Sequence, residues 1–339
     1  MNAVSVTPIN VDCSHGNIRL TVKSETNGKV VGRVIIKLGL WSCALREIAA
    51  AYRTVVFATA TEGKSDDKNK YKGYYLLSVG FLGILINQTL KMICRVPRPW
   101  VKDPNFTIVE SAREAATGYS FPSGHTQSSV GLLGTVARMT TVKALRIATI
   151  VLAVLVPISR LYLGVHTLAD VLVSSVIAVA LVLLFYPLFV KAEENPKIIY
   201  FVLGTLVALT VAYICYVSFW AFPKDVYLPE NIHNLESARK NGATLIGASS
   251  ALLVCFAIDR KFVNFDTRAV WWVQIIKTVL GIGVVVAIKE LTKAPLDAMI
   301  GSPMISRAVR YFIVTSVGAL GWPLTFKWFA KLDKKAKAD

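Results

Sequence analysis

The sequence predicts an all-α fold, a polytopic membrane helical bundle. Of the 339 residues, 54% are hydrophobic and 17% are charged, and the mean hydropathy is +0.52. Soluble domains carry more charge, about 25% of their residues. The apolar residues gather in runs that are long enough, or nearly so, to cross about 30 Å of hydrocarbon as helices. Eight runs are candidate membrane spans: residues 74–92, 126–142, 144–159, 167–190, 198–222, 242–258, 270–288 and 308–326.

The formal net charge of +17 does not indicate nucleic-acid binding, because the basic residues lie mostly in short loops between the apolar runs. Such placement is typical of membrane orientation and of sites for anionic ligands. The lysine-rich tail 327–339 marks one set of alternating loops as cytoplasmic. The five cysteines are scattered, which indicates neither a disulfide framework nor a zinc site. The loops expected on the opposite side are 93–125, 160–166, 223–241 and 289–307.

The first 73 residues form a polar N-terminal region for which we predict no membrane span. Residues 1–29 have the pattern of a tail or a short hairpin, with no cleavable signal peptide. Residues 30–58 carry apolar side chains at alternating steps of four and three from Val34 to Val55, which predicts an amphipathic helix. Five charged residues fall outside this stripe, so two arrangements stay open: a helix on the membrane surface and a helix packed against the protein.

Two charged segments lie on the side opposite the tail. Lys91 and Arg98 are seven residues apart, which places them near one face of a helix that the neighbouring prolines then end. Farther on, Ser123 precedes an apolar helix as a natural N-cap. The backbone amides of Ser123, Gly124 and His125 are expected to point to where an anion would sit.

A third segment, residues 159–170, lies where one apolar run ends and another begins. His166 and Asp170 are four residues apart and share a face of a helix, where the carboxylate can fix the tautomer of the imidazole. Arg160 offers a planar fork for phosphate oxygens. Taken alone, the segment has two interpretations: an imidazole nucleophile beside an anion clamp, or a polar membrane interface.

Together the three segments resemble the signature of the type 2 phosphatidic acid phosphatase (PAP2) superfamily, which reads K-x6-R-P, then P-S-G-H, then S-R-x5-H-x3-D. Every fixed position is filled here in the same order and spacing. The resemblance implies a PAP2-type core over residues 74–190, followed by extra C-terminal transmembrane helices over 191–326. Members commonly carry one or two spans before the first segment, whereas residues 1–73 are predicted to provide none.

The resemblance also implies a metal-free, two-step phosphoryl transfer that uses no cofactor. His166 would attack phosphorus, Asp170 would orient its ring, and His125 would protonate the leaving oxygen and later activate water. Positive charge around the phosphoryl oxygens would stabilise the transition state. The phosphate-binding residues that the resemblance implies are Lys91, Arg98, Ser123, Gly124 and Arg160.

The expected function is that of an integral membrane phosphatase acting on lipid phosphate monoesters or polyprenyl diphosphates, because a site at the bilayer surface lies at the depth of a lipid head group. The expected partners are the bilayer and a lipid substrate, and no oligomeric state is predicted. We expect a bacterial cytoplasmic membrane, with the site on its extracytoplasmic side. Two alternatives are a sugar-phosphate phosphatase of the glucose-6-phosphatase type and a non-catalytic lipid transporter or scaffold on the same fold.

Overall fold

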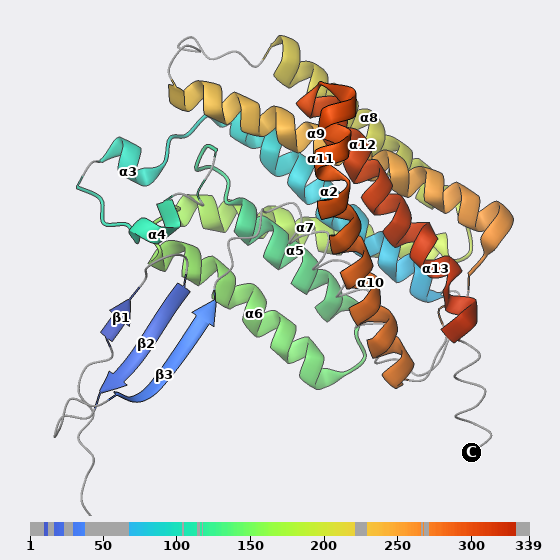
Figure 1. The fold of residues 1–339 in the computed structure, drawn as a ribbon, viewed down its shortest axis with the longest axis horizontal. Helices are drawn as coiled ribbons and strands as arrows, with labels where there is room; N and C mark the ends of the chain where they lie inside the picture. The colour runs from blue at the N-terminus through green and yellow to red at the C-terminus, as the bar shows by residue number, and fades with distance from the viewer. Residues whose placement is uncertain are drawn as a thin grey trace, which may run out of the picture.

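The computed structural model describes residues 10–12, 17–23, 30–37, 68–103, 105–113, 116, 118–220, 229–265, 267 and 271–329 (Figure 1). Its helices in the first half of the chain are α2 (Lys68–Cys94), α3 (Pro99–Lys102), α4 (Glu110–Arg113), α5 (Gly124–Met139), α6 (Lys143–Tyr162) and α7 (Leu168–Ala192). The second half contains α8 (Lys197–Phe219), α9 (Pro229–Ile258), α10 (Trp271–Leu291), α11 (Lys293–Ile300), α12 (Pro303–Ser316) and α13 (Trp322–Leu324). Two π-helical segments, η2 (Asp259–Val263) and η3 (Val317–Gly321), extend α9 and α12.

Six helical stretches of the described chain are long and apolar enough to cross a membrane. The other two predicted spans, 126–142 and 308–326, do not meet this condition. The first falls on α5, which has only 16 residues, and the second falls on α12 with its continuations η3 and α13. Helix α5 is enclosed by α2, α6 and α7, and it buries Thr126, Gln127 and Thr135 among them. The six stretches are Lys70–Lys102, Lys143–Tyr162, Leu168–Ala192, Lys197–Phe219, Asn231–Val263 and Trp272–Ile300.

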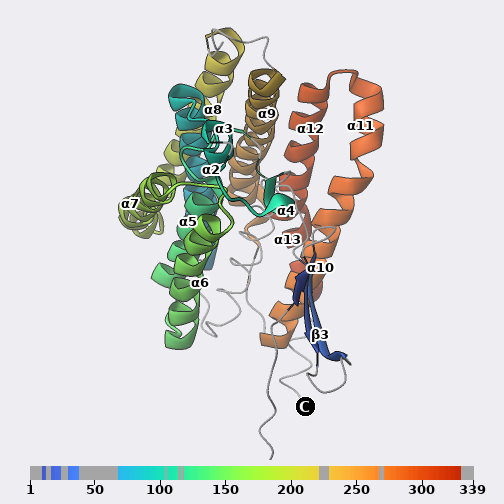
Figure 2. The same ribbon diagram turned by 90° about the vertical axis from the view of Figure 1, so that its left-hand side faces the viewer.

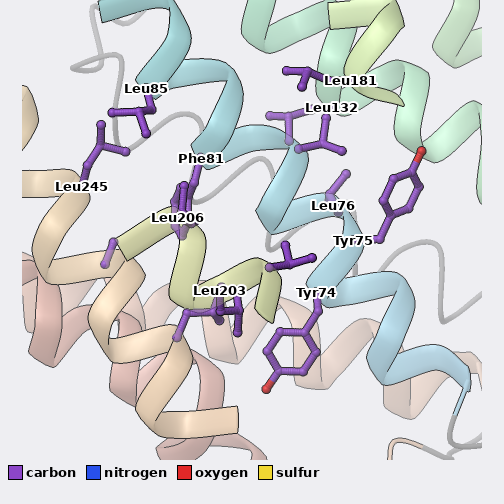
Figure 3. Packing of buried hydrophobic residues seen from close by; sticks show 14 of the residues in the cluster. Tyr74, Tyr75, Leu76, Phe81, Leu85, Leu132, Leu181, Leu203, Leu206 and Leu245 are labelled. Carbon is purple, nitrogen blue, oxygen red and sulfur yellow. The ribbon is translucent and has the colours of Figure 1, made fainter. Parts of the chain in front are cut away.

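Helix α2 is the centre of the bundle, with α5, α7, α8 and α9 packed around it (Figure 1). Its residues Tyr75 and Leu76 are at most 1% exposed. Each buried side chain of this kind contributes about 1.5–3 kcal/mol relative to an exposed one. Tyr75 and Leu76 belong to a cluster of buried hydrophobic residues that also includes residues of α5 and α7. This hydrophobic cluster fixes the positions of α2, α5 and α7, which adjoin the three charged segments. Figure 3 shows its members Leu132, Leu181, Leu203, Leu206 and Leu245.

A small antiparallel sheet lies near the N-terminus, in the order β1 (Asn10–Asp12), β2 (Asn17–Lys23) and β3 (Val30–Lys37) (Figure 1). The predicted amphipathic helix over 30–58 is therefore wrong at its start. The segment Val30–Lys37 contains five β-branched residues, which favour an extended backbone. The remainder of that prediction, 38–58, lies outside the described residues. The predicted membrane helical bundle is confirmed, with six of the eight predicted spans.

The C-terminal helices form a second layer in which α12 lies between α9 and α11 (Figure 2). The approach of α12 to α9 is closest at Gly247, where an added Cβ atom would lie 2.1 Å from the carbonyl oxygen of Ala308. The layer is joined to the core by Lys70 of α2, whose Nζ lies 3.1 Å from a carboxylate oxygen of Asp259. Lys70 also donates to the Asn264 side chain at 3.1 Å. The second layer is therefore held to α2 by a mostly buried ion pair as well as by apolar packing.

Candidate active site

The site is built where three stretches of chain meet: residues 91–98 at the end of α2, residues 118–125 before α5, and residues 163–170 before α7. Lys91 and Arg98 are 7% and 6% exposed, and His166 and Asp170 are 4% and 2% exposed. Charged groups are rarely buried so deeply unless they are paired or functional. The structure thus gathers residues from all three predicted segments into one buried polar centre.

Arg98 is not on the same helix as Lys91, and the prediction that both share one helix face is wrong. Helix α2 ends at Cys94, and Arg95 adopts a left-handed conformation with φ of 48°. Arg98 is the extended N-cap residue of α3, followed by Pro99 at its first position. Proline disfavours helical geometry in the residue before it, so the helix cannot continue through this segment.

The extended backbone turns the guanidinium of Arg98 into the middle of the site. Its Nε donates to the Gly118 carbonyl at 2.9 Å, and its Nη1 donates to the Val165 carbonyl at 2.9 Å. Nη1 also lies 3.1 Å from Nε2 of His166. One side chain thereby joins the segments before α3, α5 and α7.

The contact with Arg98 decides the tautomer of His166. A guanidinium has only donors, so Nε2 of the imidazole accepts and the ring proton of the neutral form is assigned to Nδ1. Nδ1 lies 3.4 Å from Oδ2 of Asp170, within ion-pair range but outside hydrogen-bond alignment. The lone pair of the imidazole therefore sits on Nε2, where a nucleophile needs it.

Asp170 is held rigidly, although not in the way the four-residue spacing predicts. His166 precedes α7, and Thr167 is the N-cap of that helix, so His166 and Asp170 do not share a helix face. Asp170 closes a capping box with Thr167, and its Oδ2 accepts from the Thr167 amide at 2.8 Å. The same oxygen accepts from the Ser120 hydroxyl at 2.6 Å. The helix start itself thus aims the carboxylate at the imidazole.

Ser123 is the N-cap of α5, as predicted, and its hydroxyl accepts from the Thr126 amide. Its own amide is not free, because it donates to the Asp170 carbonyl at 3.2 Å. The expectation that the amide of Ser123 points to an anion is therefore wrong. A Cβ atom at Gly124 would lie 3.3 Å from the Asn87 side-chain oxygen, so a larger residue there is crowded.

The remaining predicted residues lie around this centre. Lys91 donates through Nζ to the carbonyl of Tyr119, and its charge acts on His166. His125 is the second residue of α5 and is partly buried. Arg160 lies in the last turn of α6, with Nε 3.4 Å from the Ser159 hydroxyl. The roles of His125 and Arg160 stay predictions.

Several residues of the site were not predicted from the sequence. Ser120 is fully buried against Asp170, and no spacing rule indicates it. The T-x-x-D pattern of a capping box does indicate Thr167. Asn87 supports the turn before α5 by donating to the Pro122 carbonyl at 3.1 Å and to Gln127 at 3.1 Å. These groups position the predicted residues and are visible only once the segments are brought together.

Gly164 shapes the turn that presents His166. Its φ is +70°, a conformation that residues with a Cβ atom rarely adopt. A Cβ atom here would lie 2.6 Å from the Thr107 carbonyl oxygen. The turn is also tied to this neighbouring segment by the Val109 amide, which donates to the Leu163 carbonyl at 3.3 Å. The segment 105–109 is therefore packed directly on the turn before His166.

Burial lowers the pKa of His166 from 6.5 to about 4. The positive charges of Arg98 and Lys91 act in the same direction, whereas Asp170 opposes them. Burial disfavours the charged imidazolium, and the two cations add repulsion. His166 is therefore neutral at physiological pH, which is the form with a free lone pair.

Comparison with known families agrees with this arrangement. The profile of the PAP2 superfamily matches residues 72–195, and the profile described as PAP2 superfamily phosphatase, transmembrane extension, matches residues 243–335. The chain is 26% identical over 136 residues to undecaprenyl-diphosphatase BcrC of Bacillus subtilis (strain 168). That match covers 40% of this chain and 66% of the relative, just under two thirds of its length. No solved structure matches the chain.

The six candidate spans and these matches define an integral membrane protein with a helical core and a C-terminal membrane extension. The chain belongs to the PAP2 superfamily. All three charged segments, 91–99, 122–125 and 159–170, lie within the matched core.

Replacing Ser120 by alanine tests how the carboxylate is positioned. We expect the turnover number to fall about 10- to 100-fold with little change in KM, because a hydrogen bond to a charged group contributes about 1.5–3 kcal/mol. Ser175→Ala is the matched control, since its hydroxyl bonds only the Val171 carbonyl of its own helix. Equal activity of the two variants, with equal thermal stability, would show that Ser120 does not position Asp170.

The protonation of His166 can be followed by NMR of histidine-labelled protein in detergent. We expect one histidine, identified by its absence in His166→Asn, to stay neutral as the pH falls from 8 to 5 and to titrate near the pKa of about 4. Between pH of about 6.5 and 4, the imidazole of His166 is protonated in the unfolded chain and neutral in the native site. The free energy of unfolding therefore decreases as the pH falls through this range. Titration of this signal above pH 6 would contradict the assigned environment.

Proposed function

We propose that the protein is a metal-independent membrane phosphatase that hydrolyses lipid phosphate monoesters or polyprenyl diphosphates through a phosphohistidine at His166. Membership of the PAP2 superfamily supports the reaction class. The similarity to a protein named undecaprenyl-diphosphatase supports a polyprenyl diphosphate among the candidate substrates. His166 also lies between the candidate spans 143–162 and 168–192, at a membrane boundary where lipid phosphates are found.

The observation that carries the proposal is the 3.1 Å separation between Nη1 of Arg98 and Nε2 of His166. A guanidinium fork binds phosphate oxygens in a planar, bidentate manner. A phosphoryl group held by Arg98 is therefore next to the imidazole nitrogen that bears the lone pair. With a substrate bound, Arg98 would donate to phosphate oxygens in place of Nε2 and so release the nucleophile.

In the first step, Nε2 of His166 forms a bond to phosphorus while the bond from phosphorus to the leaving oxygen breaks. His125 would give its proton to that oxygen, which leaves as an alcohol or a lipid monophosphate. Asp170 would accept the Nδ1 proton in a hydrogen bond and stabilise the positive ring. Lys91, Arg98 and the amides at the start of α5 would hold the negative oxygens as charge develops.

In the second step, a water molecule attacks the phosphohistidine and the bond between phosphorus and Nε2 breaks. His125, now neutral, would take the proton of the water, and inorganic phosphate leaves. Arg160, in the last turn of α6, is the third cation proposed for the phosphoryl oxygens. Three cations around one dianion supply the charge that a metal ion provides in other phosphatases.

Phosphate release by the purified protein tests this function. The substrates are phosphatidate, phosphatidylglycerophosphate, sphingoid phosphate, undecaprenyl diphosphate and glucose 6-phosphate, each with and without EDTA. We expect release from at least one of the lipids, insensitive to EDTA, and a loss of about 1,000-fold or more in His166→Ala with folding retained. His233→Ala is the control, since His233 is an exposed histidine of α9. Rapid quenching and mass spectrometry should detect phosphate on His166.

Other outcomes would lead to different conclusions. Release from glucose 6-phosphate alone would favour a sugar-phosphate phosphatase. No release from any substrate, together with movement of lipid between leaflets, would favour a transporter. Unchanged turnover of His166→Ala would refute the proposed nucleophile.

We also propose that the site faces the extracytoplasmic side, as the distribution of basic loops indicates. Cys94 is exposed and ends α2, three residues after Lys91. We expect a membrane-impermeant maleimide to label it on intact cells, and this label to be lost in Cys94→Ser. Labelling that appears only after permeabilisation would place the site on the cytoplasmic side.

A further inference from the structure

Arg310 of α12 is a deeply buried cation that the proposed phosphatase site does not use. It is 6% exposed, and its Nε and Nη1 atoms are buried without a hydrogen-bond partner among the described residues. Buried polar groups are nearly always paired, and a guanidinium cannot lose its charge to relieve its burial. Ionisable groups within membrane proteins commonly mark binding sites. Arg310 therefore points to an anionic partner from outside the chain.

Two acidic side chains that act on this pair of arginines, Arg307 and Arg310, are engaged elsewhere. Glu290 of α10 lies close enough for its charge to interact with Arg310, but its carboxylate is 2.6 Å from Nζ of Lys289 and its side chain is 60% exposed. Asp297 of α11 accepts a hydrogen bond from the Ser306 hydroxyl. Neither carboxylate reaches Nε or Nη1 of Arg310. The two buried donors are thus left for another oxyanion.

A second arginine stands beside the first. Arg307 precedes Arg310 by three residues, so the two lie on adjacent turns of one face of α12. The Cζ atom of Arg307 is 5.5 Å from the ring centroid of Tyr311, and that of Arg310 is 5.7 Å from it. Both arginines therefore lie next to the same aromatic ring. Arg307 is only partly buried, and its Nε donates to the Thr244 hydroxyl at 2.8 Å. The pair thus runs from partly buried Arg307 to buried Arg310.

Charge around the pair favours an anion. Lys289 is 19% exposed at its side chain, and Lys293 at the start of α11 is exposed. With Arg307 and Arg310 these make four cations against the two carboxylates of Glu290 and Asp297. The cations range from exposed Lys293 to buried Arg310, and their excess of positive charge attracts an anion.

The pair lies on the same side of the bundle as the catalytic centre. Asn241 of α9 donates to Gln88 of α2 at 3.0 Å, one turn before Lys91. Thr244, which holds Arg307, is one turn farther along α9. Arg307 is therefore about two helical turns from the level of Lys91 toward the middle of the bundle. The close contact at Gly247 fixes this part of α12 against α9.

We propose that Arg310 and Arg307 form a second oxyanion site, separate from the phosphatase centre, that binds the phosphate group of an anionic membrane lipid. The planar guanidinium matches the geometry of phosphate oxygens, and a lipid brings its phosphate to the bilayer boundary together with chains that enter the hydrocarbon. Inorganic phosphate has the same head chemistry, so the test distinguishes these two sources.

Native mass spectrometry of the purified full chain counts the bound lipids. The probes are phosphatidylglycerol, diacylglycerol, which lacks phosphate, and inorganic phosphate. We expect wild type to retain one more phosphatidylglycerol than Arg310→Met, with at least tenfold weaker binding in the variant, and Arg307→Gln to fall between them. Lys240→Gln is the control, because Lys240 is an exposed cation paired with Glu236 one turn away. Diacylglycerol should not bind at this site.

Thermal unfolding gives a second measurement that does not depend on catalysis. In delipidated protein, Arg310→Met should unfold at the same or a higher temperature than wild type, because replacing a buried unpaired charge by an apolar chain removes a desolvation cost. Phosphatidylglycerol should raise the unfolding temperature of wild type more than that of Arg310→Met. If inorganic phosphate alone gives this difference and the lipid adds nothing, the site is supported with free phosphate as its ligand.

Two results would overturn the proposal. One is equal retention of phosphatidylglycerol and of phosphate by wild type, Arg310→Met and Arg307→Gln. The other is a loss of stability in delipidated Glu290→Gln equal to that in Arg310→Met, which would show that the two residues pair within the chain. Neither measurement depends on phosphatase activity. The anion-site proposal can therefore fail or hold independently of the proposed reaction.

Discussion

The guanidinium of Arg98 joins the parts of the catalytic centre by bonding the Gly118 and Val165 carbonyls and meeting His166 at 3.1 Å. Because arginine only donates hydrogen bonds, this contact determines the tautomer of the imidazole as well as its position. In the proposed reaction the same cation would bind the phosphoryl group, so a single residue would both order the resting site and prepare the nucleophile. Arg98 can do this only because the chain leaves the helix after Cys94 and becomes extended.

The bundle places these segments by conventional packing. Helix α2 is surrounded by α5, α7, α8 and α9, and the hydrophobic cluster brings the end of α2 and the starts of α5 and α7 together. The starts of α5 and α7 are then linked by the Ser123 amide, which donates to the Asp170 carbonyl. The buried charges can therefore be held in a geometry suited to the reaction, since apolar packing supplies the stability that desolvation of the charges removes.

Arg98 and Arg310 have similar exposure, 6% each, but different surroundings. Arg98 forms hydrogen bonds with two carbonyls and an imidazole, so these contacts offset much of the desolvation cost of burying its charge. Arg310 has two buried nitrogens without such partners among the described residues. This contrast is the basis for the proposal that Arg310 binds an oxyanion from outside the chain.

The sequence by itself determined the class of fold, six of the eight predicted spans and the residues of the three segments, since hydropathy and motif spacing are properties of the local chain. It was wrong about the helix at Val30–Lys37, where β-branched residues favour a strand, and about the helix faces assumed for Arg98 and His166. Only the tertiary structure decided how Arg98 reaches His166, that Ser120 holds Asp170, and that Nε and Nη1 of Arg310 have no hydrogen-bond partner among the described residues. These facts depend on contacts between residues far apart in the chain, and no local pattern encodes them.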